Sequence, residues 1–278
     1  MTAIRSASTL HHVANPSAAA GAGSGRIRTI GYRHAHAVGE LLAAAFHDES
    51  VTRWLAPDVD TRPATMTGFF TAMATSAFTT GSVDVLLDRH EIPIAAGVWF
   101  DHTTPHPSRD SHGDVDGGVG SEPEGGAFGL SRPVTDPSKD PWTLLDQAMT
   151  AAHPTQPHEY LMLIGVHPAY QGQGLGTRLL THHHAWLDAT STPAYLEATS
   201  PDSRALYARL GYDDHADPIH PAGPPRDAPG CHDTAPTLWP MWRPPGSAPA
   251  IDPDRSPRPA DGAAVTGLGA SRVLRWVT

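Results

Sequence analysis

Apolar positions in the first hundred residues predict a strand, two helices and a hairpin, in that order. The pattern begins with a short strand at 26–30. Two stretches then repeat apolar residues at helical spacing, the first over 35–46 and the second over 66–77. Apolar runs at 83–88 and 94–100 are joined by the short segment RHEIP, which is typical of a hairpin.

The second half of the chain alternates helices with strands, as an α/β arrangement requires. A proline in the first turn and a helical pattern mark the first of these helices, and Gly211 ends the last. The stretch TLWPMWRPPG predicts a closing strand. The expected elements are a helix at 141–152, a strand at 160–166, a helix at about 174–189, a strand at 194–199 and a helix at 201–210.

Three segments lack any periodic pattern. Residues 1–25 are rich in Ala, Gly and Ser and predict a disordered lead. The stretch at about 101–140 is rich in Gly, Pro and Asp, so it is either a functional lid or, as we favour, a disordered acidic insertion. A Pro-rich tail covers 245–278. We therefore expect a single domain over 26–244.

Composition excludes several classes of partner. The net charge of −10 provides no basic surface for nucleic acid or for an anionic membrane. The N-terminal segment has no apolar core of the signal-peptide kind, and no run approaches about 18 apolar residues. The single Cys231 excludes an internal disulfide and a cysteine-cluster metal site. A cytoplasmic protein, monomeric or homodimeric, is expected.

Three glycines stand where the apolar run at 160–166 must turn into a helix: Gly172, Gly174 and Gly176. A helix N-terminus has backbone N–H groups without internal partners and a partial positive charge. Glycine lets that backbone approach a phosphate closely, so the turn suits a pyrophosphate, although an ordinary flexible turn would also contain glycines. No lysine follows Gly176 as a P-loop requires, and the spacing GxGxG departs from the dinucleotide fingerprint GxGxxG.

The turn does fit QxxGxG, at Gln171, Gly174 and Gly176, preceded by VHP at 166–168. A second motif, LYxxLGY, ends the helix at 206–212. In these two motifs, over about 158–212, the chain resembles the GNAT N-acetyltransferase superfamily. Through YLEAT, LLAAAFHDES and TLWPMWRPPG it is most similar to puromycin N-acetyltransferase and its actinobacterial relatives.

The resemblance implies the GNAT acyl-CoA N-acyltransferase fold, a mixed central sheet splayed between strands 4 and 5 and flanked by helices. It also implies acetyl-CoA as the acyl donor, with its arm along the fourth strand and its pyrophosphate on the glycine turn. The expected acetyl-CoA-binding residues are Ile164, Gly165, Val166, Gln171, Gly172, Gln173, Gly174, Leu175, Gly176, Thr177, Ser203 and Tyr207.

Acetyl transfer to an amine needs a base for the amine and help for the departing thiolate. Tyr207 is the candidate for the thiolate, as a hydrogen-bond donor at least as much as an acid, because a phenol with a pKa of about 10 is a weaker acid than a thiol at about 8.5. Packing alone would also explain Tyr207. As bases, Glu197, His158 and Glu159 all qualify, although each is also readily explained as a solvated polar residue; we select Glu197.

The acceptor pocket implied by the resemblance lies between the first two helices. Its candidate residues, Phe46, Asp48, Glu49 and Trp54, combine acidic and aromatic groups, which suits a cationic amine with an apolar body. The expected substrate is a small-molecule amine of antibiotic or secondary-metabolite type, attacked directly in a ternary complex. Two alternatives stay open: acetylation of a peptide or protein at its N-terminus or a lysine, and a noncatalytic acyl-CoA-binding module.

The chain contains 18 histidines, which raises the question of a metal. The consecutive run at 182–184 spreads its side chains around a helix, so a solvated surface is expected there. The pairs at 11–12 and at 34 and 36 lack a third ligand in register. No metal site is therefore expected from the sequence.

Overall fold

The computed structural model describes residues 25–103, 140–221 and 235–247. The predicted lead, nearly all of the predicted insertion and most of the tail lie outside these ranges. No helix among the described residues is sufficiently long and apolar to span a bilayer.

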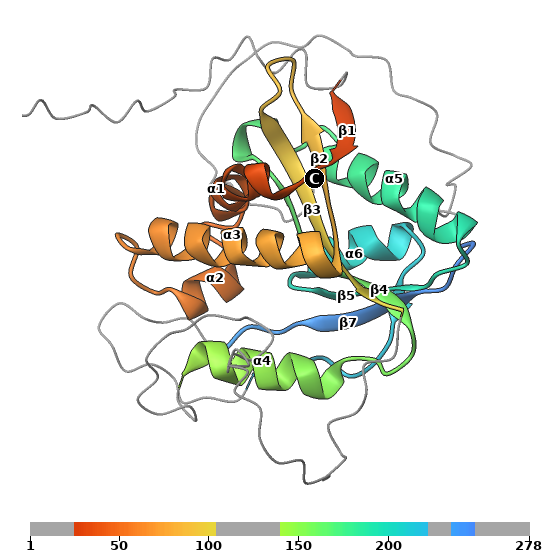
Figure 1. Ribbon diagram of the computed structural model, residues 1–278. Coiled ribbons are helices and arrows are strands. Elements are labelled where there is room, and N and C mark those ends of the chain that lie inside the picture. Colours follow the sequence, from red (N-terminus) through yellow and green to blue (C-terminus); the bar gives the residue numbers. More distant parts are fainter. Residues whose placement is uncertain (1–24, 104–139, 222–234, 248–278) are drawn as a thin grey trace, which may run out of the picture.

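The described elements follow the predicted order closely. The helices are α1 (Ala35–Ala45), α2 (Ser50–Leu55), α3 (Arg62–Thr80), α4 (Pro141–Ala152), α5 (Leu175–Ala189) and α6 (Pro201–Arg209). The strands are β1 (Arg26–Thr29), β2 (Gly81–Leu87), β3 (Pro93–His102), β4 (His158–Val166), β5 (Ala194–Ala198), β6 (Asp213–Asp214) and β7 (Trp239–Arg243). They form one sheet in the order β1-β2-β3-β4-β5-β7-β6 (Figure 1).

The central strands of this sheet separate, as predicted. β4 pairs with β3 along its whole length in antiparallel register. On its other side it pairs with β5 in parallel, but only through Glu159↔Ala194 and Tyr160↔Tyr195. Beyond Tyr160 that edge of β4 has no strand partner among the described residues. The prediction of a mixed sheet, splayed between its fourth and fifth strands and flanked by helices, is confirmed.

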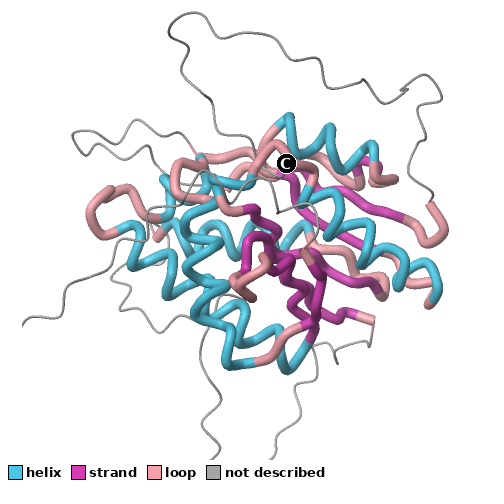
Figure 2. Tube along the Cα trace, turned by 90° about the horizontal axis from the view of Figure 1, so that it is seen from above, coloured by secondary structure: helices cyan, strands magenta, loops and turns pink. Residues whose placement is uncertain are grey.

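Helices cover both faces of the sheet. One apolar core joins α1, α2, α3 and α4 to alternate residues of β2 and β3, such as Val83, Val85 and Val98. The second core joins α5 and α6 to the opposite face, where Leu86 and Ile94 point. Figure 2 shows the strands between these two groups of helices. The β5-facing edge of β4 therefore lies between the two groups of helices.

Helix α2 and the short strand β6 were not predicted from the sequence, and α2 has a local cause. Glu49 precedes α2 with extended backbone, and its carboxylate accepts a hydrogen bond from the Val51 N–H at 2.7 Å. A side chain that satisfies a free amide at a helix start stabilises the helix, even one of six residues. The segment that the sequence analysis treated as a loop is thus partly helical.

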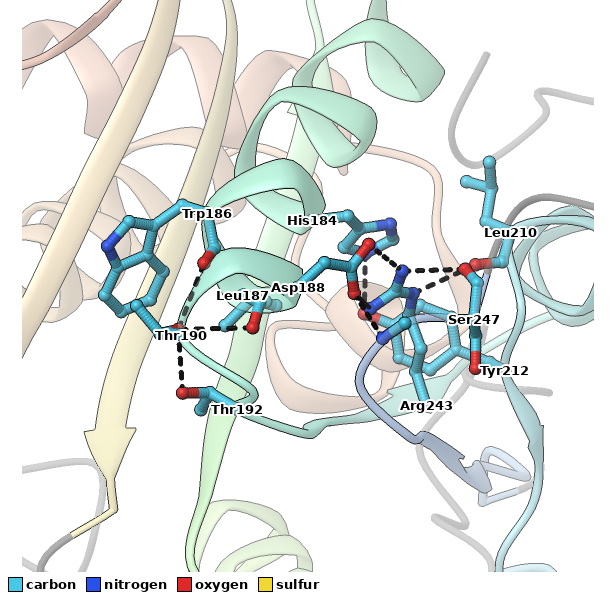
Figure 3. Close-up of polar contacts among 11 residues, drawn as sticks. His184, Trp186, Leu187, Asp188, Thr190, Thr192, Leu210, Tyr212, Arg243 and Ser247 are labelled. Carbon is cyan, nitrogen blue, oxygen red and sulfur yellow. Dashed lines mark hydrogen bonds and ion pairs between the residues drawn. The ribbon is translucent and has the colours of Figure 1, made fainter.

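A polar network ties α5 to the ends of α6 and β7 (Figure 3). The buried Arg243 guanidinium donates to both carboxylate oxygens of Asp188, each at 2.8 Å. It also donates to the carbonyls of Leu210 at 3.3 Å and Ser247 at 2.8 Å. The hydrogen bonds of Arg243 hold the pKa of Asp188 below its usual value. Every polar group at this junction has a partner, which is typical of a structural network.

The expectation that residues 182–184 form a solvated surface is wrong for two of the three histidines. His183 and His184 are buried, and only His182 is exposed. The His183 ring contacts the Asp84 carboxylate at 2.8 Å, and the His184 ring contacts the Tyr212 hydroxyl at 3.0 Å. These polar partners, one on β2 and one after α6, allow histidines of α5 to face the core.

Candidate active site

A small apolar cavity opens where β4 and β5 separate. Its volume is about 90 Å³, and its wall comes from α2, α3 and α4, from Phe46 just after α1, from β4 and β5, and from α6. Four of its lining residues carry polar side-chain groups: Thr52, Glu197, Thr199 and Tyr207. An apolar cavity with a few convergent polar groups is the usual form of a small-ligand site.

Glu197 is the one carboxylic acid in the wall of this cavity. The Tyr160 hydroxyl donates to Glu197 Oε2 at 2.8 Å, while Oε1 is buried without a partner among the described residues. Burial raises the pKa of Glu197 to about 7, although the hydrogen bond from Tyr160 lowers it. A carboxyl group that titrates near neutral pH can accept a proton from an amine and release it again.

Tyr207 lies in the same wall, on α6. Its side chain is buried, and burial raises its pKa above the usual value. Its ring packs against Tyr212, with centroids 5.8 Å apart. The hydroxyl makes no hydrogen bond within the described part of the chain. A raised pKa makes Tyr207 a still weaker acid than the sequence analysis assumed, and leaves it suited to donate a hydrogen bond.

The glycine turn follows β4 and has the geometry that glycine permits. Gly172 and Gly174 adopt φ values of +77° and +72°, in the left-handed region that disfavours other residues. A Cβ at either position would meet nothing within 4 Å, so the turn faces open space. Gly174 precedes α5 without any side-chain cap. The first amides of α5 are thus available to an anion.

Two predicted cofactor residues use their side chains to build the site rather than to face it. The Gln171 side-chain amide donates to the Val166 carbonyl at 3.1 Å and so braces the turn against β4. Ser203 is buried in a capping box at the start of α6, where it exchanges hydrogen bonds with Ser200. One helical turn places Ser203 and Tyr207 on the same face, but only Tyr207 lines the cavity.

Gly165 serves the packing of α1 against β4. A Cβ there would lie 2.8 Å from Leu42, 3.0 Å from Ala45 and 3.3 Å from Phe46. Only its backbone is therefore available to a ligand. Of the remaining predicted cofactor residues, Ile164 lines the cavity and Val166 ends β4. The others lie in the turn or the first turn of α5: Gln173, Leu175, Gly176 and Thr177.

The predicted substrate residues do not gather in one place. Phe46 lines the cavity. Trp54 is buried in the core and Glu49 caps α2, and neither contributes to the cavity wall. Asp48 is exposed and pairs with His47 at 3.8 Å, on a separate hollow beside α1 and α3. Only Phe46 of these four residues therefore lies where the polar groups converge.

Sequence reasoning missed Tyr160 and Tyr195, which flank Glu197. Their strand positions could have revealed them, because Tyr195 and Glu197 share one face of β5 and the parallel pairing places Tyr160 opposite Tyr195. The two other proposed bases, His158 and Glu159, are buried rather than solvated. Neither lines the cavity.

Comparison with known proteins agrees with this geometry. Residues 144–214 match the family model described as the acetyltransferase (GNAT) domain. This match covers about a quarter of the chain and supports the GNAT resemblance over that segment. The matched segment includes β4, the glycine turn, α5, β5 and α6, which together form the separated strands and the turn. The predictions of the GNAT resemblance and of an acetyltransferase enzyme are thereby confirmed.

Solved structures share the fold over most of the chain. An arylalkylamine N-acetyltransferase 2 from Aedes aegypti has a TM-score of 0.53 and 11% identity, covering 79% of this chain and 98% of its own. The polyamine N-acetyltransferase of Drosophila melanogaster has a TM-score of 0.52 and 17% identity, covering 79% and 99%. A histone acetyltransferase HPA2 and related acetyltransferase from Corynebacterium glutamicum has a TM-score of 0.50 and 23% identity, covering 82% and 99%. At these identities the likeness shows the fold. The finer similarity to puromycin N-acetyltransferase stays a prediction.

Proposed function

We propose that the protein is an acetyl-CoA-dependent N-acetyltransferase that modifies the amine of a small molecule. The observation that carries this proposal is a buried carboxyl group with a pKa of about 7, Glu197, in an apolar cavity beside Tyr207. Antibiotic or secondary-metabolite amines are the substrate class we propose, and the cytoplasm the location.

The residues present fit acetyl-CoA in two respects. The edge of β4 beyond Tyr160 has no strand partner on the β5 side among the described residues, so its backbone groups can bond an extended amide-containing arm. The open glycine turn and the start of α5 offer amides to a diphosphate. When bound, the thioester supplies an acyl carbon that an amine can attack.

Glu197 and Tyr207 then divide the proton chemistry. Glu197 accepts the proton that the amine loses as its nitrogen bonds to the acyl carbon. Tyr207 would donate a hydrogen bond to the sulfur as the carbon–sulfur bond breaks, and the thiolate would take its proton from solvent. The products are an amide and a free thiol. The low polarity of the surrounding wall strengthens both interactions.

The size of the cavity favours a small acceptor. Its volume of about 90 Å³ is well below the roughly 300–1,000 Å³ typical of pockets that bind drug-sized ligands. Only a short amine-bearing end therefore reaches Glu197 without rearrangement. Helix α2 contributes Val51, Thr52 and Leu55 to the wall. A peptide acceptor would need an open groove at this point, and a noncatalytic module would have no use for a base near neutral pH.

Thiol release from acetyl-CoA tests the proposal. The purified chain is assayed with a panel of small amines, peptides and buffer alone, and calorimetry measures the binding of CoA. We expect CoA binding and turnover with small amines only. Turnover confined to peptides would replace the acceptor class, and binding without any turnover would favour the noncatalytic module. No uptake of CoA at millimolar concentration would overturn the proposal entirely.

A further inference from the structure

Three histidines converge at the end of the sheet, away from the cavity wall. They are His102 at the end of β3, His153 just after α4 and His158 at the start of β4. The His153 Nε2 atom lies 3.2 Å from His102 Nδ1 and 3.1 Å from His158 Nε2. One nitrogen from each ring lies within 4.8 Å of both others. His158 is buried, and the other two are partly buried.

The three neutral rings do not carry enough N–H groups to form a hydrogen bond at each nitrogen–nitrogen contact. His158 Nδ1 lies 2.6 Å from the Gln156 carbonyl, which can only accept, so this nitrogen carries the proton of the ring. In the neutral ring, His158 Nε2 then carries no proton, and its lone pair points towards His153 Nε2. A single proton on His153 Nε2 would have to serve both His102 and His158. A cation at the centre would satisfy all three nitrogens.

Two of the three nitrogen–nitrogen distances fit a tetrahedral transition-metal ion, and the third, between His102 and His158, lies within 4.8 Å. With zinc–nitrogen distances of about 2.0–2.1 Å, two ligands of a tetrahedron lie about 3.3 Å apart. The contacts of 3.1 and 3.2 Å are close to that value. The hydrogen bond of His158 to a backbone carbonyl also matches the usual support of a metal-bound histidine, because it fixes the ring and its tautomer.

We propose that His102, His153 and His158 form a binding site for a divalent transition metal, with zinc as the best match to three imidazoles. A fourth position is left for water or another donor. The sequence analysis expected no metal site, because the ligands come from three elements and His102 and His153 are separated by 51 residues in the chain.

The proposed site would clamp α4 against the sheet near the candidate active site. His153 follows α4, whose Leu145 and Met149 line the cavity. The His153 ring also packs edge-on against Tyr160 and Tyr195, with centroids 4.9 and 5.0 Å apart. Tyr160 in turn holds Glu197. We therefore expect the metal to stabilise the fold whether or not the chain acetylates an amine.

Cobalt titration of the chelator-stripped full chain tests the site, because a tetrahedral Co²⁺ complex absorbs visible light strongly. We expect saturation at one equivalent, displacement by Zn²⁺, and a rise in the unfolding temperature with Zn²⁺. His153→Ala and His102→Ala should each weaken Co²⁺ binding at least roughly 10-fold, as loss of a ligand does. The matched control is His36→Ala, since His36 is exposed on α1. It should bind as the wild type does.

Two ligand variants keep the test decisive, because His102 and His153 are both only partly buried and lie on different elements, so misfolding of one variant would not explain a loss in both. Circular dichroism shows whether each variant is folded. Absence of tetrahedral Co²⁺ absorption in the wild type would overturn the site. So would wild-type binding in both ligand variants, which would assign the metal to other histidines of this histidine-rich chain.

Discussion

Two buried polar networks, both involving strand β5 or its partner β7, differ in how completely they are satisfied. Around Arg243, all nearby charges and carbonyls are joined, including the Gly246 N–H that reaches Asp188 at 2.8 Å. Around Glu197, the Tyr160 hydroxyl donates at 2.8 Å, and the Tyr195 hydroxyl lies close enough to lower the Glu197 pKa as well. Glu197 Oε1 and the Tyr195 hydroxyl have no well-formed hydrogen bond among the described residues. The groups around Arg243 keep their charges at neutral pH, whereas Glu197 gains or loses a proton near neutral pH.

This difference separates a structural role from a chemical one. Paired charges have their pKa values held away from neutrality, as for Asp188. A buried carboxyl with few partners has its pKa raised towards neutrality, as for Glu197. Unsatisfied polar groups destabilise a fold, so their presence at a cavity indicates that a ligand or a reaction uses them. Substitutions in the two networks should accordingly affect different measurements.

Breaking the satisfied network should give the largest effect, and on stability alone. Arg243→Met removes the guanidinium donor from Asp188 and from two carbonyls, and leaves Asp188 only the Gly246 N–H. We expect a loss of about 3 kcal/mol in the free energy of unfolding, near the lower end for a broken buried pair because Asp188 is partly exposed. Urea denaturation measures this loss, and kcat of the folded variant should change little.

The matched control for Arg243 is Arg204→Met. Arg204 also pairs with an aspartate, Asp214, but both side chains are more than two-fifths exposed. An exposed pair contributes much less than a buried one, because solvent screens the two charges, so the loss of stability should be small. Equal losses in the two variants would show that completeness of the buried network does not set its contribution to stability.

Removing the proposed base should instead reduce activity. Glu197→Gln keeps the shape but cannot accept a proton, so kcat/KM should fall roughly 100-fold, or about 2.7 kcal/mol. In the wild type the rate should rise with pH through about 7, the pKa of Glu197, and the variant should lose that rise. A variant with full activity and the same pH profile would remove Glu197 from the mechanism.

The same variant gives a stability test of the raised pKa. Folding raises the Glu197 pKa from 4.5 to about 7, so the folded state binds this proton more tightly than the unfolded state does. This tighter binding stabilises the folded wild type at low pH, and the stabilisation is lost as pH rises from 4.5 through about 7. Gln stays neutral. Glu197→Gln should therefore match the wild type below pH 4.5 and unfold at a higher temperature above pH 7. A constant difference in unfolding temperature would contradict the shift.

Replacing the proposed hydrogen-bond donor should have a smaller effect on turnover. Tyr207→Phe removes one hydroxyl and keeps the ring that packs on Tyr212. A hydrogen bond to a developing thiolate contributes about 1.5 kcal/mol or more, so kcat should fall about 10-fold with little change in KM. Burst and steady-state thiol release measure this. Unchanged kcat and KM would show that Tyr207 has a packing role only.

Sequence periodicity and the glycine motif predicted the sheet, most helices and the turn, because those features depend on local pattern. The side-chain partners depend on contacts between distant elements and were not predicted. Ser203 was expected to face the cofactor but caps α6, and Glu49 was expected at the substrate but caps α2. His183 and His184 can be buried because their rings contact the Asp84 carboxylate and the Tyr212 hydroxyl, which lie far from them in the sequence. The separation of β4 and β5 was expected from the family resemblance that the motif carries, whereas the convergence of three histidines depends on strand register and was not expected.

The smallest expected effect tests whether Tyr160 positions and tunes Glu197. Tyr160→Phe removes the donor at 2.8 Å, and this hydrogen bond lowers the Glu197 pKa. The midpoint of the pH–rate profile should therefore move up, by about one unit or less for a bond of about 1 kcal/mol. Tyr195→Phe is the comparison variant, because the Tyr195 hydroxyl also lowers the Glu197 pKa, but less than that of Tyr160. It should move the midpoint less. A downward shift, or a larger shift for Tyr195→Phe, would show that the unsatisfied network is organised around Tyr195 instead.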